Sequence, residues 1–165
     1  MNHLVISFIT EDRPGLVDQL SKVIKQHQGN WQTSSLHHLS GFFTGILEIA
    51  VEKSQCDALT NALKALPDFK INIEQTSPEE TNNSADIVLE LTANDREGIV
   101  QEISSIIHHQ GGNMIKLVST QDNAPHTGQA LFKSKITLSV NDDQTENLIS
   151  ALENLADDLM VDISR

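Results

Sequence analysis

The sequence has almost no cysteine and no long hydrophobic run. Its 165 residues include one cysteine, Cys56, which can form neither an internal disulfide nor a cysteine-rich zinc site. No apolar stretch approaches the roughly 18 residues that a membrane-spanning helix needs. Residues 1–10 lack the basic segment that begins a signal peptide, so none is expected. Together these absences favour a cytoplasmic protein with no membrane partner.

Basic and aromatic residues are also scarce. Lysine and arginine number 11 against 23 aspartates and glutamates, which gives a formal net charge of −12, and the chain has one tryptophan and no tyrosine. Nucleic-acid phosphates are bound by clustered lysines and arginines, and unpaired bases stack on aromatic side chains. The composition therefore argues against a direct nucleic-acid partner, including RRM-type RNA binding, and against an anionic membrane surface.

What the sequence does contain is an internal repeat. Residues 4–35 align with residues 87–118 at an offset of 83, and residues 47–66 align with residues 136–155 at an offset of 89. The second copy therefore carries six more residues, which we place in the polar stretch 121–129. The pairs that are identical at the first offset include Val5/Val88, Asp12/Asp95, Arg13/Arg96, Gly15/Gly98, Val17/Val100, Gly29/Gly112 and Asn30/Asn113.

The repeat divides the chain into two domains. Each copy is long enough to have its own hydrophobic core, which distinguishes it from one turn of a solenoid. The boundary is marked by the polar stretch TSPEETNNSA, which contains Pro78 and has no apolar periodicity. We therefore expect a first domain at residues 1–75, a linker at 76–85 and a second domain at 86–165.

Within each copy the apolar pattern changes from a strand period to a helix period. Alternate residues are apolar in 4–8 and 87–91, which predicts strands with one buried face. The apolar residues of 16–24 and 99–107 follow helical spacing. In the first copy we expect further strands near 31–39, 43–52 and 71–73, and a second helix at 57–66.

The resulting order in each copy is β-α-β-β-α-β. This order is typical of an α+β fold in which an antiparallel sheet has helices on one face. Pairing the two sheets edge to edge would protect their open edges. We therefore expect the two copies to form one sheet of eight strands.

The turn between the first strand and the first helix of each copy is the most specific local feature. It reads EDRPGLV from Glu11 and NDREGIV from Asn94. A helix start presents unpaired N–H groups and the positive end of the helix dipole, so a small anion can bind there. Asp12 and Asp95 have an alternative role as N-caps, which is compatible with ligand binding by the neighbouring amides.

These residues carry a family resemblance that covers nearly the full chain. An Asp-Arg-Pro-Gly-Leu-Val turn after an apolar strand, followed by a helix that ends in Gly-Asn within a βαββαβ unit, resembles the ACT domain. The resemblance implies a ferredoxin-like module that binds amino acids and regulates metabolic enzymes or transcription. Two such copies with no further domain resemble the glycine cleavage system transcriptional repressor family.

The resemblance also implies a set of ligand-binding residues. In ACT domains the ligand lies between the strand–helix turn of one copy and a neighbouring copy, and the asparagine after the first helix makes polar contacts. For Asn30 and Asn113 the sequence leaves a helix C-cap open as an alternative. The positions implied here are Asp12, Arg13, Pro14, Gly15, Leu16 and Asn30 in the first copy, and Asp95, Arg96, Glu97, Gly98, Ile99 and Asn113 in the second. Because Glu97 would repel a ligand carboxylate, the first copy is the better candidate.

The function that the resemblance implies is regulatory and non-enzymatic. The ligand would be a small amino acid, with glycine expected, and the partner would be a LysR-type transcriptional activator of the glycine cleavage genes. The alternative is an amino-acid-sensing regulatory subunit of a metabolic enzyme. A homodimer is compatible with either function.

Other chemistry finds little support in the sequence. His37 and His38 are adjacent on an expected strand and point to opposite faces, and His108 and His109 are adjacent near a helix end, so neither pair can easily share a metal ion. We expect no metal, no cofactor and no catalytic residue. The charge is uneven, because residues 1–75 carry a net −2 and residues 86–165 a net −8. We expect the second copy to present its surface to a basic protein partner.

Overall fold

The computed structural model describes residues 1–78 and 86–164. Contacts between Cα atoms divide the chain into two compact units, Met1–Thr81 and Asn82–Arg165. Most of the predicted linker at 76–85 lies outside the described residues, so the predicted domain boundaries stay a prediction. Each unit is described by itself below.

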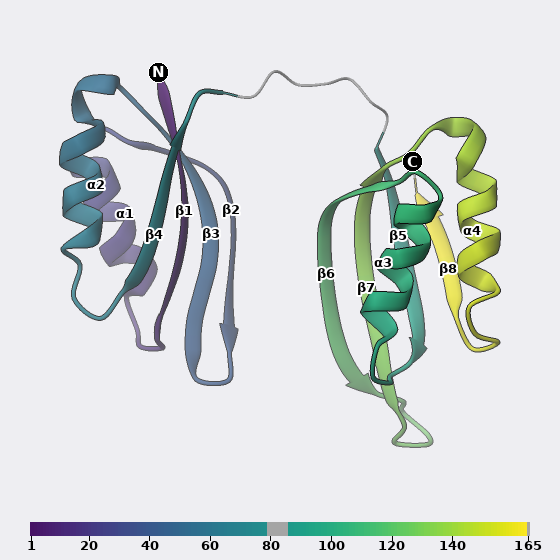
Figure 1. The fold of residues 1–165 in the computed structure, drawn as a ribbon. Coiled ribbons are helices and arrows are strands. Elements are labelled where there is room, and N and C mark those ends of the chain that lie inside the picture. The colour runs from purple at the N-terminus through teal and green to yellow at the C-terminus, as the bar shows by residue number, and fades with distance from the viewer. Residues whose placement is uncertain (79–85, 165) are drawn as a thin grey trace. The chain divides into compact units, whose positions relative to one another are not determined.

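The first unit has the predicted βαββαβ order (Figure 1). Its four strands form an antiparallel sheet in the order β2-β3-β1-β4. The strand that carries the predicted turn, β1, is therefore a central one. The elements are β1 (Asn2–Glu11), α1 (Leu16–Gln26), β2 (Asn30–Leu39), β3 (Phe42–Val51), a short 3-10 helix η1 (Lys53–Gln55), α2 (Cys56–Lys64) and β4 (Lys70–Thr76).

The second unit repeats this arrangement. Its sheet has the order β6-β7-β5-β8 and is also antiparallel. The extra residues lie in the hairpin between β6 and β7, because Leu39 pairs with Phe42 in the first unit whereas Asp122 pairs with Leu131 in the second. The elements are β5 (Asp86–Asn94), α3 (Ile99–His109), β6 (Asn113–Asn123), β7 (Ala130–Ser139), η2 (Asp142–Gln144), α4 (Thr145–Glu153) and β8 (Met160–Ser164).

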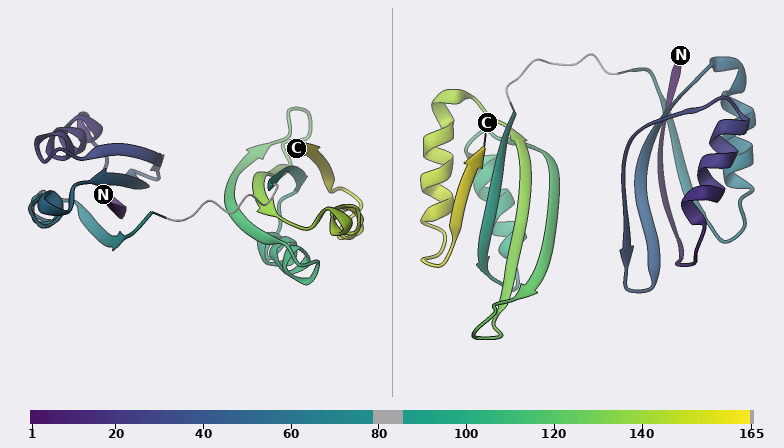
Figure 2. Two further views of the ribbon diagram at one scale, coloured as in Figure 1. Left: turned by 90° about the horizontal axis from the view of Figure 1, so that it is seen from above. Right: turned by 180° about the vertical axis from the view of Figure 1, so that it is seen from behind.

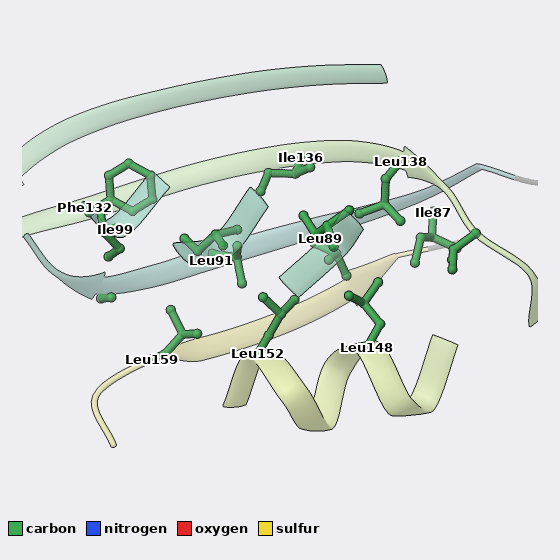
Figure 3. Packing of buried hydrophobic residues seen from close by; sticks show 14 residues of the cluster. Ile87, Leu89, Leu91, Ile99, Phe132, Ile136, Leu138, Leu148, Leu152 and Leu159 are labelled. Carbon is green, nitrogen blue, oxygen red and sulfur yellow. The ribbon is translucent and has the colours of Figure 1, made fainter. Parts of the chain in front are cut away.

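In each unit both helices lie on the same face of the sheet (Figure 2). Alternate strand residues point toward the helices, which is why the predicted period of two marks the core. In the second unit, Leu148 and Leu152 of α4 point at Leu89 on the central strand β5, and all three are fully buried (Figure 3). The predicted α+β fold with helices on one face is confirmed. The described strands form two sheets of four, and the pairing of these sheets into one of eight stays a prediction.

The first helix of each unit ends in a tight turn with one left-handed residue. The residue with a left-handed backbone is Gln28, with a φ of 59°, in the first unit and Gly111, with a φ of 76°, in the second. The next residue donates its N–H to the carbonyl five residues earlier, from Gly29 to Ile24 at 2.9 Å and from Gly112 to Ile107 at 2.9 Å. This is the Schellman motif.

Gly29 is therefore required for space and not for its backbone angle. A Cβ atom at Gly29 would lie 2.9 Å from Cγ2 of Ile24 and 3.0 Å from Cγ2 of Ile49 on β3. Gly112 is equally close to its own helix, with a Cβ position 2.9 Å from Cγ2 of Ile107. In the first unit the left-handed conformation belongs to Gln28, and neither Gly29 nor Asn30 has it. The glycine instead allows the helix end to lie against the sheet.

Neighbouring substitutions at this turn should have opposite effects on stability. We expect Gly29→Ala to lower the free energy of unfolding of the first unit by about 1–3 kcal/mol, because the added methyl group overpacks a filled contact. Gln28→Gly should raise it by about 0.5–1 kcal/mol, because glycine removes the cost of a left-handed side-chain-bearing residue. Urea unfolding followed by the fluorescence of the single tryptophan, Trp31, reports on this unit within the whole chain. If both substitutions changed the free energy of unfolding in the same direction, Gln28 would not be the strained residue and Gly29 would not be the crowded one.

Candidate functional site

The turn between β1 and α1 begins its helix with glycine. Gly15 is the N-cap, with a φ of 87°, and its carbonyl accepts a hydrogen bond from the Gln19 N–H at 3.0 Å. Gly98 has the same role in the second unit, with a φ of 82°. No side chain from the described residues caps either helix. The first amides of each helix therefore have no side-chain acceptor, and in the second unit the Ile99 N–H donates to the Arg96 carbonyl at 3.5 Å.

This geometry corrects one interpretation of the two aspartates. Asp12 and Asp95 lie three residues before the N-cap, so they are not helix caps. The physical reason is that a left-handed glycine, Gly15 or Gly98, occupies the N-cap position itself. The helix dipole and its amides remain available to an incoming anion.

Each aspartate instead binds a side chain from the strand that follows the helix. The Nδ1–H of His38 on β2 donates a hydrogen bond to the Asp12 carboxylate. The amide Nε2–H of Gln121 on β6 donates to the Asp95 carboxylate. Both pairs are 26 residues apart, so they are the same contact in the two copies. The sequence analysis considered His38 only as a metal ligand and missed this role. The repeat offset of 83 aligns His38 with Gln121, and that alignment could have indicated a shared role.

The two turns differ in the charge around their arginine. In the first unit, the Arg13 guanidinium donates to the uncharged Oε1 of Gln19 at 2.9 Å. In the second unit, Arg96 forms an ion pair with Glu102, which occupies the position equivalent to Gln19. The hydrogen bond from Arg96 is the main reason that the pKa of Glu102 is lowered, and the same bond raises the pKa of Arg96. The positive charge is thus neutralised in the second copy and retained in the first.

The first turn also borders two hollows in the protein surface. The smaller, of about 210 Å³, is lined by Asp12, Arg13, Gly15, Leu16, Val17, Asp18 and Phe43. This turn pocket gathers four of the six residues that the resemblance implied for the first copy. The larger, of about 570 Å³, shares Asp12 and Arg13 with the turn pocket and extends to the start of β4.

Asn30 and Asn113 lie at the far end of the first helix of their own units. Asn30 begins β2 and pairs with Ala50, whereas the turn precedes α1 (Figure 1). A helix of 11 residues separates them, which corresponds to about 16 Å. Neither asparagine is a C-cap, because His27 and Gln110 occupy those positions. Within one unit the structure therefore does not bring the asparagine to the turn.

The second turn keeps the backbone of the first and changes its chemistry. Arg96, Glu97 and Gly98 are exposed, and Ile99 is buried as the first residue of α3. Glu97 replaces Pro14 and adds a negative charge beside the helix start. Together with the neutralised arginine, this charge makes the second turn a poorer site for a carboxylate.

Two further observations concern metal ions and membranes. Among the described residues there is no group of three or more histidine, cysteine, aspartate or glutamate side chains that could hold a metal ion. The longest described helices, α1 and α3, have 11 residues each, and none of the described helices has the length and apolar character needed to cross a bilayer.

Comparison with known proteins identifies the fold. Residues 2–74 match the family model of the ACT domain, so the first unit is an ACT domain. A crystal structure of an unknown protein from Galdieria sulphuraria has a TM-score of 0.82 and 24% identity, covering 99% of this chain and 98% of that chain. Another crystal structure, of a protein proposed to be a glycine cleavage system transcriptional repressor, has a TM-score of 0.71 and 20% identity, covering 99% and 98%. No significant match was found among curated proteins. The predicted tandem ACT fold is confirmed.

The ion pair in the second turn should make part of that unit's stability depend on pH. Because Arg96 lowers the pKa of Glu102 below its ordinary value of 4.5, the ion pair stabilises the folded unit above that value. The contribution is lost as the pH falls through the lowered pKa. We expect a carboxyl carbon NMR titration to place the midpoint of Glu102 below 4.5, and Arg96→Gln to raise it. An unchanged midpoint in the variant would contradict the ion pair.

Proposed function

We propose that this tandem ACT-fold protein binds a small amino acid at the first turn and regulates transcription through a protein partner. The observation that supports this most directly is the retained positive charge of Arg13 beside a helix start that no side chain caps. Both features lie at the turn pocket. The second turn has the same backbone but a neutralised arginine. Binding is therefore assigned to the first unit.

The groups at the turn pocket are complementary to a zwitterion. A ligand carboxylate can accept hydrogen bonds from the first amides of α1 and lie near the Arg13 guanidinium. Two carboxylates, Asp12 and Asp18, also line the pocket and can accept from the ligand ammonium group. The volume of about 210 Å³ suits an amino acid with little or no side chain. We propose glycine.

The proposed biological role is repression of the glycine cleavage genes. A full-length structural relative is itself proposed to be a glycine cleavage system transcriptional repressor. The acidic composition makes direct DNA binding unfavourable, so the effect on transcription requires a DNA-binding partner. We propose a LysR-type activator for that partner. The groups at the turn bind and release a ligand without a covalent step, which fits a non-enzymatic regulator.

The surface of the second unit supports a basic partner. The short helix η2 and helix α4 carry four exposed carboxylates, from Asp142, Asp143, Glu146 and Glu153, and no lysine or arginine. We refer to these residues as the acidic α4 surface. Complementary charge raises association rates and makes a complex sensitive to salt. We propose that this surface contacts the partner.

A single substitution should separate ligand binding in the two units. We expect calorimetry to detect glycine binding to the wild-type chain. Gln19→Glu should weaken this binding by about tenfold, because the new carboxylate neutralises Arg13 and repels the ligand carboxylate. The matched change in the second unit, Glu102→Gln, should leave glycine binding unchanged. A chain that gives no heat with any of the common amino acids at millimolar concentration would refute the ligand proposal.

The partner proposal requires its own experiment. We expect affinity capture from an extract, followed by mass spectrometry, to recover a LysR-type activator, and its affinity to fall with rising salt. Reversing charge in Glu146→Lys and Glu153→Lys should weaken the complex, whereas Lys22→Glu in the first unit should have a smaller effect. Recovery of a metabolic enzyme instead would favour the alternative of a regulatory subunit. A complex that is insensitive to salt would contradict the acidic α4 surface as the contact.

A further inference from the structure

The sheet of the first unit has one face that its own helices leave uncovered, because both helices lie on the opposite face (Figure 2). This uncovered face, which we call the open face, carries five large hydrophobic side chains that are between 41% and 59% exposed. They come from β1, β2 and β3, and they are Val5, Ile9, Leu39, Phe42 and Ile46. An exposed apolar patch of this kind is typical of a surface that binds another protein.

The second unit shows that the fold does not require an apolar open face. The strand registers align Ile9 with Thr92 and Ile46 with Lys135. Lys135 pairs across the strands with Glu90, so opposite charges occupy the centre of that face. A sheet face that meets water carries such polar residues. We propose that the apolar open face of the first unit packs on the same face of a second copy of this chain, in a twofold dimer.

Two charged residues of β4 make the open face complementary to itself. Lys70 pairs with Ile9, and Glu74 pairs with Val5. Asn72 lies midway between the two charges. Lys70 and Glu74 are exposed, and neither has an ion-pair partner among the described residues. One copy of the face therefore offers both a cation and an anion, which is what an interface between identical surfaces needs.

The strand register selects the position of the twofold axis. If the axis lies between the two sheets and crosses the strands at the level of Asn72, each β4 faces the β4 of the second copy in the reverse direction. Residues equally far from Asn72 on opposite sides then meet. Lys70 faces Glu74 of the second copy, and the apolar neighbours Ile9 and Val5 face each other in the same way. An axis two residues further along in either direction would set Lys70 against Lys70 or Glu74 against Glu74, which like-charge repulsion disfavours.

The open face is large enough for a stable dimer. Strands β1, β2 and β3 have 10 residues each. Strands of this length extend for about 33 Å, and four strands are about 19 Å wide. The flat area is then about 600 Å² per copy, whereas stable interfaces bury about 600–1,000 Å² on each side. Packed sheets keep their strands within about 30° of each other, so the long side chains of Lys70 and Glu74 stay within reach.

Sedimentation equilibrium of the whole chain, without added amino acid, tests the inference. We expect a dimer, and we expect Ile46→Lys to raise its dissociation constant by about tenfold or more, because a charge then enters the interface from both copies. The strand tolerates this change, since Lys135 occupies the equivalent position in the second unit. Val100→Lys, which alters an exposed apolar residue on α3, is the matched control and should leave the dimer unchanged.

A charge exchange tests the twofold arrangement. Lys70→Glu should weaken the dimer by about tenfold, because it sets like charges against each other, and adding Glu74→Lys to the same chain should restore it. The inference is overturned by a chain that is monomeric at millimolar concentration, by a dimer that Ile46→Lys leaves intact, or by a double variant that is not restored. The variants are compared after circular dichroism has shown the wild-type fold. The inference does not rest on the proposed function, because calorimetry with glycine measures binding at the turn pocket separately.

Discussion

The tight packing at the end of the first helix is the constraint that the two units share. At Gly29 and Gly112 the helix end lies so near its surroundings that a single methyl group would collide with the isoleucine one turn earlier. This contact fixes one end of the helix, and the left-handed glycine at the other end fixes where the helix begins. The β1–α1 turn is therefore held from both sides. Its amides and its arginine are thus positioned without a ligand, and this preorganisation would lower the entropic cost of the proposed binding.

The two units show how one backbone can carry two different surfaces. The turns have equivalent hydrogen bonds, donated by His38 to Asp12 and by Gln121 to Asp95. They differ in whether the arginine meets an amide or a carboxylate. The shared backbone therefore presents different side chains in the two copies, and the proposed ligand site depends on those side chains. In this chain the residues suited to a ligand gather in the first unit, and the exposed carboxylates of η2 and α4 belong to the second.

The sequence predicted the fold well because the fold depends on local periodicity. The apolar pattern located the strands and helices, since buried residues recur every two positions in a strand and every three or four in a helix. The roles of Asp12 and Gly29 could not be predicted in this way. The partner of Asp12 is 26 residues away across the sheet, and the need for Gly29 comes in part from Ile49 on another strand. The larger hollow beside the first turn was missed because Lys70 and Ile9, which both line it, meet only through strand pairing.

The difference between Gln19 and Glu102 can arise from a single nucleotide change. The codons of glutamine and glutamate differ in their first base alone, so a single nucleotide change interconverts the two residues. In a duplicated domain, such a change neutralises the arginine of one turn while the other copy keeps its charge. The backbone of both turns survives the change, because neither side chain takes part in the helix N-cap. In a tandem protein of this kind, a single base change at the codon of Gln19 would therefore remove the charge on which the proposed ligand site depends, while the fold is kept.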